Sequence, residues 1–352
     1  MPATAVGLPP RLSLAWVIVL ALSSMSRGAT AQADRPAYHV ARQIKLGGDG
    51  RWDYITVDTA GNRLFIARQT RIMVVDPASG RVLGEIPGID GAHGVALDYA
   101  TGHGFASAGR SGTVTMFDLK TLKVLGNHRA ADDADAILYD PVSNLVFSFN
   151  GDAHSASVID PVSGESVGTI PLGGKPEFGV SAGDGKLYVN IEDQGEIVEI
   201  NAAAHRVLRR WSLRPCTEPT GLAIDQVHHR LFSGCHSKVM AVSDAVAGKL
   251  IATVPIGAGV DGNAFDPATG LAFSSNGEGT LTVVREDSPA SFRTVATIPT
   301  RRGARTMALD PRTHRIFTVT ADLGTPPPPT EQDPHPRPPV VPGTFTLLVL
   351  DR

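Results

Sequence analysis

The chain has 352 residues, and its composition excludes several classes of protein. Hydrophobic residues make up 42% and charged residues 19%, which is enough apolar matter for a packed core and excludes a chain that is disordered throughout. The formal net charge of -3 provides no general attraction to nucleic acid or to an anionic membrane. Two cysteines exclude both a disulfide-rich miniprotein and a four-cysteine zinc module. The 37 glycines and 26 prolines favour many turns over long helices.

The first 31 residues have the pattern of a secretory signal peptide. Arg11 precedes an apolar run at residues 12–22, and Ala29 and Ala31 form an Ala-x-Ala cleavage signal. The alternative is a membrane anchor, but the run is shorter than the ~20 residues that span a bilayer. We therefore expect cleavage after Ala31 and a mature protein in the periplasm or outside the cell. No membrane span is expected after cleavage.

The rest of the chain repeats itself seven times. Asp58 and Asp310 stand six repeats apart, which gives a period of (310 − 58)/6 = 42 residues. The fourth repeat has Gly183-Asp184 in a shorter turn, whereas the other six end their first predicted strand on an aspartate. Because turn sequences follow these aspartates, we expect their carboxylates to accept hydrogen bonds from turn amides. They are Asp58, Asp98, Asp140, Asp225, Asp266 and Asp310, joined by Asp76, Asp118, Asp160 and Asp244 at the ends of third strands.

Each repeat alternates apolar and polar residues over short runs that are broken by turns, as four short strands do. Four strands in about 42 residues are typical of one β-propeller blade. The last repeat supplies only three strands, while residues 38–46 form an unassigned strand ahead of the first repeat. We therefore predict an all-β fold over residues 38–352: a seven-bladed β-propeller with four-stranded antiparallel blades, the seventh closed by the N-terminal strand. A β-solenoid, the alternative, explains neither the spare strand nor the missing one.

The repeat resembles a known family. Residues 158–171 read Val-Ile-Asp-Pro-Val-Ser-Gly-Glu-Ser-Val-Gly-Thr-Ile-Pro, which is similar to the YVTN-type repeats of YncE-like secreted bacterial β-propellers. Further similar segments lie at 175–178, 188–193, 218–225, 274–280 and 303–306. The resemblance covers about residues 40–352 and implies the propeller fold. It implies no reaction, because propellers host unrelated activities. Some YncE-like proteins are thought to bind DNA, but this chain has no basic surplus that supports a nucleic-acid partner.

One position of the repeat predicts a functional site. In a propeller the innermost strand of each blade lines the central channel, and its first residue lies at the channel mouth. This residue precedes the strand-ending aspartate by five positions. In the fourth repeat, which has the shorter turn, the equivalent position is shifted by one residue. Ring symmetry would gather these side chains around one opening, with Glu218 two residues away from the fifth. They are Asp53, His93, Asp135, Glu177, Thr220, Asp261 and Arg305.

Several kinds of chemistry fit such a mouth, because like charges held close raise one another's pKa or require a cation. Asp135, Glu177 and Asp261 are candidate ligands for Ca²⁺ or another divalent metal, with Asn150, Asn190 and Asn276 as neutral oxygen donors. The mouth could equally bind a small cationic or polyhydroxyl ligand or a segment of a partner protein. With His93 as base and Glu177 as the second catalytic candidate, it could also run metal-assisted hydrolysis, such as lactone opening. The simplest alternative is a purely structural, water-filled mouth.

The two cysteines lie in the fifth repeat. Antiparallel pairing through the turn at residues 226–230 places residue 220 roughly opposite Cys235, so Cys216 can curl back to reach it. We expect a Cys216–Cys235 disulfide, which an oxidising compartment favours. The alternative is a soft-metal site for copper or zinc made of Cys216, Cys235 and His236.

The seventh repeat carries a proline-rich insertion at residues 324–343. Such a segment cannot form a helix or the interior of a strand, so we expect it to be extended polyproline II or disordered. It joins the second and third strands and should emerge on the mouth face. It is either a tolerated surface loop or a lid or docking strip.

Overall fold

The computed structural model describes residues 1–5, 7, 38–331, 334 and 336–352. The chain divides into two units, Met1–Asp34 and Arg35–Arg352, and the fold below is that of the second. The predicted signal peptide lies outside the described residues except for residues 1–5 and 7, so it stays a prediction. Within the described ranges, no helix has the length and apolar character needed to cross a membrane.

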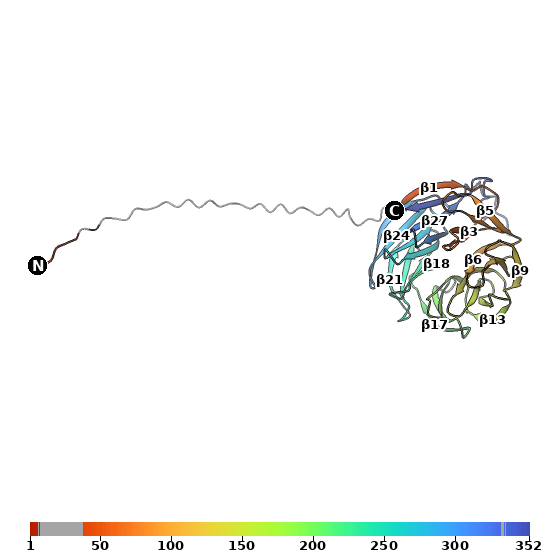
Figure 1. Ribbon diagram of the computed structural model, residues 1–352, viewed down its shortest axis with the longest axis horizontal. Helices are drawn as coiled ribbons and strands as arrows, with labels where there is room; N and C mark the ends of the chain where they lie inside the picture. Colours follow the sequence, from red (N-terminus) through yellow and green to blue (C-terminus); the bar gives the residue numbers. More distant parts are fainter. Residues whose placement is uncertain (6, 8–37, 332–333, 335) are drawn as a thin grey trace. The chain divides into compact units, whose positions relative to one another are not determined.

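Seven four-stranded antiparallel sheets make up the described part of the second unit (Figure 1). Blade 1 contains β2 (Ile55–Asp58), β3 (Arg63–Arg68), β4 (Arg71–Val75) and β5 (Val82–Pro87). Blade 2 contains β6 (Ala92–Asp98), β7 (His103–Ala108), β8 (Thr113–Asp118) and β9 (Val124–Arg129). Blade 3 contains β10 (Ala134–Asp140), β11 (Leu145–Asn150), β12 (Ser155–Ile159) and β13 (Ser166–Pro171).

The remaining blades follow the same order, and the seventh combines the two ends of the unit. Blade 4 contains β14 (Pro176–Ser181), β15 (Lys186–Ile191), β16 (Glu196–Asn201) and β17 (Arg206–Ser212). Blade 5 contains β18 (Pro219–Asp225), β19 (Arg230–Cys235), β20 (Val239–Asp244) and β21 (Lys249–Pro255). Blade 6 contains β22 (Val260–Asp266), β23 (Leu271–Asn276), β24 (Thr280–Ser288) and β25 (Ser291–Pro299). Blade 7 contains β26 (Met307–Asp310), β27 (Arg315–Thr320), β28 (Thr346–Asp351) and β1 (His39–Lys45).

Burial follows the position of a strand within its blade. The middle strands β11 and β12 are buried along nearly their whole length, whereas β13 is exposed at most positions. Middle strands pack against neighbouring blades on both faces, which explains why they read as nearly continuous apolar runs. The fourth strands β9, β13 and β17 lie at the outside of the ring (Figure 1).

The N-terminal strand closes the ring as predicted. It pairs antiparallel with β28, for example Val40 with Leu350, so sheet 7 has four strands like the others. A fully buried arginine on β3 supports this closure: the Arg68 guanidinium donates to the carbonyls of Asp49 at 2.7 Å and Gly50 at 3.1 Å. The same guanidinium lies 3.6 Å from the centre of the Phe345 ring, a cation–π contact. Blade 1 is thereby tied both to the segment that follows β1 and to the segment that precedes β28.

The turn aspartates have the structural role expected from the sequence. Asp58 accepts a hydrogen bond from the Gly61 amide at 2.7 Å, and Asp225 accepts one from the Val227 amide at 2.9 Å. The other eight predicted turn aspartates also accept amide hydrogen bonds from their own turns.

The disulfide prediction is confirmed, because Cys216 and Cys235 are bonded with their Cα atoms 5.6 Å apart. The soft-metal alternative is wrong, since neither sulfur is a free thiolate and His236 Nδ1 instead contacts Glu218 at 2.8 Å. The predicted register was off by one residue: Cys235 lies opposite Pro219, because a bulge shifts the pairing between β18 and β19.

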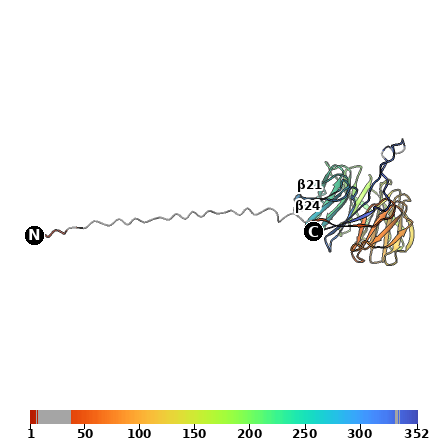
Figure 2. The same cartoon turned by 90° about the horizontal axis from the view of Figure 1, so that it is seen from above.

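The proline-rich insertion is partly pinned at its base. Leu323 and Val340 form an isolated antiparallel bridge, and the Gly324 amide donates to the carbonyl of Pro339 at 2.8 Å. These backbone contacts extend into residues 324–343, which we expected to be extended polyproline II or disordered. The side view shows the segment between β27 and β28 standing out from the blades (Figure 2).

Candidate functional site

The seven strand-start positions line a single cavity of about 630 Å³. Local geometry explains how they come to face it. Five of the innermost strands, in blades 2 to 6, have a bulge at their first residues, as between Ala92 and Val95 in blade 2. A bulge re-aims a side chain at a sheet edge, and each of these bulges contains the ring residue. The seven residues are Asp53, His93, Asp135, Glu177, Thr220, Asp261 and Arg305.

Close approach of the innermost strands narrows the channel below these side chains. A Cβ on Gly221 would lie 2.7 Å from the backbone nitrogen of Asn263, and one on Gly262 would lie 2.8 Å from that of Met307. Both glycines follow a ring residue directly, so only glycine lets the neighbouring blade come this close.

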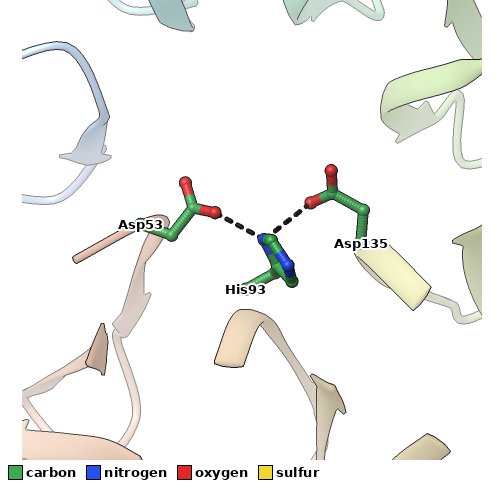
Figure 3. Close-up of side chains that lie close together, drawn as sticks. All are labelled: Asp53, His93 and Asp135. Atoms are coloured by element: carbon green, nitrogen blue, oxygen red, sulfur yellow. Dashed lines mark hydrogen bonds and ion pairs between the residues drawn. The ribbon is translucent and has the colours of Figure 1, made fainter. Parts of the chain in front are cut away.

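His93 lies between two carboxylates (Figure 3). Its Nδ1 atom is 2.6 Å from Asp53 Oδ2 and 3.3 Å from Asp135 Oδ1, so the contact joins three consecutive blades. Burial alone lowers the pKa of His93, but the hydrogen bond that it donates to Asp53 and the charge of Asp135 outweigh burial and raise the pKa to about 9. His93 is therefore a cation at neutral pH.

The carboxylates of the ring are poorly neutralised. Burial raises the pKa of Asp135, and the neighbouring Asp53 adds to the rise while His93 opposes it. Burial and the charges of Asp135 and Glu192 raise the pKa of Glu177 in the same way. The pKa of Asp261 is raised by burial despite the opposing charge of Arg305. Removing these carboxylates from water costs more than the nearby cations return.

Two further cations contact carboxylates of the ring. Arg305 Nε lies 3.2 Å from Asp261 Oδ2, at the position that the sequence predicted. Lys175 Nζ lies 3.4 Å from Glu177 Oε1 and 2.9 Å from Glu192 Oε2. Sequence reasoning missed Lys175 and Glu192 as site residues, although Lys175 stands two residues before a ring position.

The side chains that lie close enough to share a metal ion are not the three that the sequence suggested, which were Asp135, Glu177 and Asp261. Among the described residues at the mouth, Asp53, His93 and Asp135 have donor atoms within 4.8 Å of one another, and neither Glu177 nor Asp261 belongs to this group. A metal held here would therefore use imidazole nitrogen together with two carboxylates.

Four of the predicted ligands do not line the cavity. Glu218 has a 60% exposed side chain and contacts His236. The three asparagines are fully buried and donate hydrogen bonds to other residues of the blades, as Asn190 of blade 4 does to the carbonyl of Thr220 in blade 5 at 2.8 Å. Asn150 donates to Ser157 Oγ at 3.1 Å and Asn276 to Thr282 Oγ1 at 3.0 Å. Their position at the end of a second strand places them behind the ring, which corrects their assignment as neutral donors.

The insertion contributes to the rim of the same cavity. Leu323, Arg337 and Pro338 line it, and the Arg51 guanidinium donates to the carbonyl of Pro338 at 2.8 Å. The prediction that the insertion emerges on the mouth face is thus confirmed for Arg337 and Pro338, and Leu323, which directly precedes the insertion, also lines the cavity. The sequence feature that allowed this prediction is the position of the insertion between the second and third strands of blade 7.

The opposite end of the channel is lined by uncharged residues. A second cavity of about 530 Å³ is lined by side chains of the innermost strands such as Ile55, Val95 and Phe265. Tyr54 lines the mouth cavity, and its ring centre lies 5.3 Å from that of Phe178, which lines the second cavity. These two rings lie between the charged end of the channel and the uncharged end.

Comparison with known proteins establishes the fold. No protein-family model and no curated protein matches the chain. A solved structure titled Kuenenia stuttgartiensis Hydrazine Synthase is 16% identical, with a TM-score of 0.65, over 83% of this chain and 95% of that chain. A structure of U3-55K is 11% identical, with a TM-score of 0.71, over 88% of this chain and 99% of that one. A crystal structure of RRP9 WD40 repeats is 11% identical, with a TM-score of 0.72, over 90% and 100%. At these identities the similarity supports the β-propeller fold alone.

Proposed function

We propose that this protein is a binding propeller whose channel mouth captures a cation, either a metal ion or a positively charged group of a small ligand or protein segment. The observation that carries the proposal is the convergence of four acidic strand-start residues on one cavity. Their side chains are more buried than those of the cations beside them: Glu177 is 10% and Asp261 14% exposed, against 36% for Lys175 and 38% for Arg305. A cation that enters this layer relieves repulsion that the resident cations leave in place.

A metal ion and an organic cation would use the mouth differently. A metal held by Asp53, His93 and Asp135 must displace the proton of His93, because an imidazole binds metal in its neutral form. An ammonium or guanidinium group needs only the carboxylates and leaves His93 protonated. Proton release on binding therefore distinguishes the two ligands.

Isothermal titration calorimetry tests this proposal. We would titrate the purified protein at pH 7 with Ca²⁺, Mn²⁺, Zn²⁺ and an oligoarginine peptide, in two buffers of different ionisation enthalpy. Saturable binding that Asp135→Asn weakens and the matched Glu165→Gln leaves intact supports the proposal, since the Glu165 side chain is 73% exposed and lies away from the mouth cavity. If no probe binds, or Asp135→Asn has no effect on any of them, the mouth is structural.

A metal-assisted hydrolase of the lactonase type is the second candidate. The arrangement of His93 with two carboxylates favours it, because such a group can hold a metal that activates water. His93 would then be a ligand. Glu177, whose pKa is raised to about 9, would be protonated near neutral pH and would serve as the proton donor to the leaving group. Turnover of a lactone that metal restores and Glu177→Gln abolishes would support this candidate, whereas binding without turnover would exclude it.

The biological setting proposed here rests on the sequence. Residues 158–171 support membership of the YncE-like propellers, and the pattern of residues 1–31 supports export to the periplasm or the exterior. A protein partner would present a basic segment to the mouth, with the insertion beside it. Nucleic acid is not part of the proposal, because the carboxylates of the mouth would repel phosphate.

A further inference from the structure

A second group of two carboxylates and one imidazole lies away from the mouth. Asp225 is the last residue of β18, His228 lies in the turn that follows, and Glu286 is on β24 of the next blade. Since the mouth lies at the first residues of the innermost strands, the end of β18 belongs to the opposite face. None of these three residues lines the mouth cavity. We call Asp225, His228 and Glu286 the rim cluster.

The imidazole of the rim cluster contacts both carboxylates. His228 Nδ1 lies 2.5 Å from Asp225 Oδ2 and 3.7 Å from Glu286 Oε1, and the three donor atoms are within 4.8 Å of one another. The side chains of Asp225 and Glu286 are 2% and 4% exposed, whereas that of His228 is 48% exposed. The cluster therefore has a buried acidic floor and one open side.

Glu286 is the unusual member. Neither of its carboxylate oxygens has a hydrogen-bond partner, although its side chain is almost entirely buried. Native proteins rarely leave a buried carboxylate in this state, because the lost hydration is not replaced. Burial and the charge of Asp225 raise the pKa of Glu286 to about 7, against the opposing charges of His228 and Arg230. Arg230 is engaged elsewhere, since it contacts Asp244 Oδ2 at 3.1 Å and donates to the carbonyl of Pro289 at 2.7 Å.

The same position in other blades receives a donor from the neighbouring blade. Asp58 accepts from Tyr99 Oη at 3.0 Å, and Asp140 accepts from Ser181 Oγ at 2.5 Å. Asp266 contacts His314 Nδ1 at 2.8 Å. At the interface between blades 5 and 6, Asp225 instead meets the carboxylate of Glu286, and His228 contacts both. Two buried carboxylates therefore meet here, whereas at the three other interfaces an aspartate contacts a hydrogen-bond donor.

We propose that Asp225, His228 and Glu286 bind one divalent transition-metal ion that ties blade 5 to blade 6. An imidazole nitrogen and two carboxylate oxygens form a donor set that Zn²⁺ accepts, with water completing a tetrahedron on the exposed side. The ion would give the carboxylate of Glu286 a direct ligand contact, whereas its present contact with His228 Nδ1 is 3.7 Å long and neither oxygen has a hydrogen-bond partner among the described residues. Small side-chain rotations would bring the three donors to the ion. This site is independent of any ligand at the mouth.

Zn²⁺ binding by calorimetry, after chelator treatment and dialysis, tests the proposal on the full protein. We expect Glu286→Gln and His228→Asn each to weaken one Zn²⁺ equivalent at least about tenfold, the lower end of what is lost even when residues that merely support a metal ligand are changed. His314→Asn is the matched control, because Asp266 and His314 repeat the Asp–His contact and lie outside any group of three close donors among the described residues. Asp53→Asn distinguishes the rim cluster from the mouth, because it changes a mouth carboxylate and should leave the affinity of the rim cluster for Zn²⁺ unchanged.

Thermal unfolding with and without Zn²⁺ provides the second readout. Zn²⁺ should raise the melting temperature of the wild type and of His314→Asn but not that of Glu286→Gln. If Glu286→Gln does not fold, His228→Asn decides, because its partly exposed side chain is less needed for packing. Unchanged Zn²⁺ affinity and stoichiometry in both variants would overturn the proposal. The absence of any Zn²⁺ effect on the wild type would also overturn it and would indicate a proton shared between Glu286 and Asp225 instead.

Discussion

The mouth and the rim cluster each bring two carboxylates close to one imidazole, but the residues come from different parts of the fold. At the mouth, His93 lies between Asp53 and Asp135, and the three residues come from three consecutive blades. In the rim cluster, Asp225 and His228 come from a single turn, and Glu286 is the only contribution of the neighbouring blade. Both arrangements place one imidazole between two carboxylates. The mouth depends on ring symmetry, whereas the rim cluster depends on one interface.

The difference lies in what surrounds the imidazole. Asp53 also lies 3.8 Å from Arg305 Nη2, so the mouth carboxylates share several cations and the charge is distributed. Glu286 has His228 within ion-pair distance, and neither of its oxygens accepts a hydrogen bond from the described residues. A distributed network should respond to pH as a whole and tolerate exchange of one cation for another. An isolated group should respond to one substitution or one ion.

The largest effect expected is on the pH dependence of stability in the metal-free protein. The pKa of His93 is raised to about 9, so its contribution is fully present below its unfolded value near 6.5 and is lost as pH rises through about 9. That single group accounts for about 3 kcal/mol of unfolding free energy. The raised pKa values of Asp135 and Glu177 act in the same direction. Urea unfolding from pH 5 to pH 9.5 should show a steady loss, and a flat profile would contradict the assignment.

Removing the mouth imidazole comes next. His93→Gln leaves Asp135 buried beside Asp53 without a cation, and we expect it to cost about 2 kcal/mol at pH 7. The double variant His93→Gln/Asp135→Asn should recover part of this loss, because the unpaired charge is then gone. Chemical denaturation measures both. His128→Gln, which breaks a contact to the exposed Glu165, is the control and should stay within about 0.5 kcal/mol of the wild type.

Removing the rim carboxylate should have the opposite sign. Because the pKa of Glu286 is raised from 4.5 to about 7, the metal-free fold loses stability as pH rises between these two values, and the loss is complete above about 7. Glu286→Gln should therefore stabilise the chelated protein by about 1 kcal/mol at pH 8.5 and by almost nothing at pH 4, after allowance for screening at the open side. Unfolding curves at the two pH values test this. A loss of stability at pH 8.5 would show that Glu286 has a partner, and the contrast with the mouth would fail.

The smallest effect on stability is expected for the pair of His314 and Asp266, which among the described residues has no second carboxylate beside it. His314→Asn removes one partly exposed contact to Asp266 and should cost about 0.5–1 kcal/mol. It should also leave Zn²⁺ binding unchanged. If this cost equals that of His93→Gln, the second carboxylate at the mouth adds nothing to the strength of the contact.

The repeat pattern made some residues of the site predictable and left others hidden. Equal spacing from the turn aspartates located Asp53, His93 and Arg305, because every blade folds alike. Glu218 was misplaced by the same reasoning: it stands two residues before Thr220, yet its side chain is exposed and contacts His236. Spacing along a chain cannot say which way a side chain points where a strand begins.

The sequence by itself determined the blade count, the closing strand, the turn aspartates and the Cys216–Cys235 disulfide. All of these follow from local patterns that recur with a fixed period. Only the tertiary structure decided that bulges turn the ring residues into the channel, that His93 contacts both neighbouring blades, and that Glu286 meets Asp225 across an interface. Register shifts and contacts between blades depend on packing in three dimensions, which no single repeat encodes.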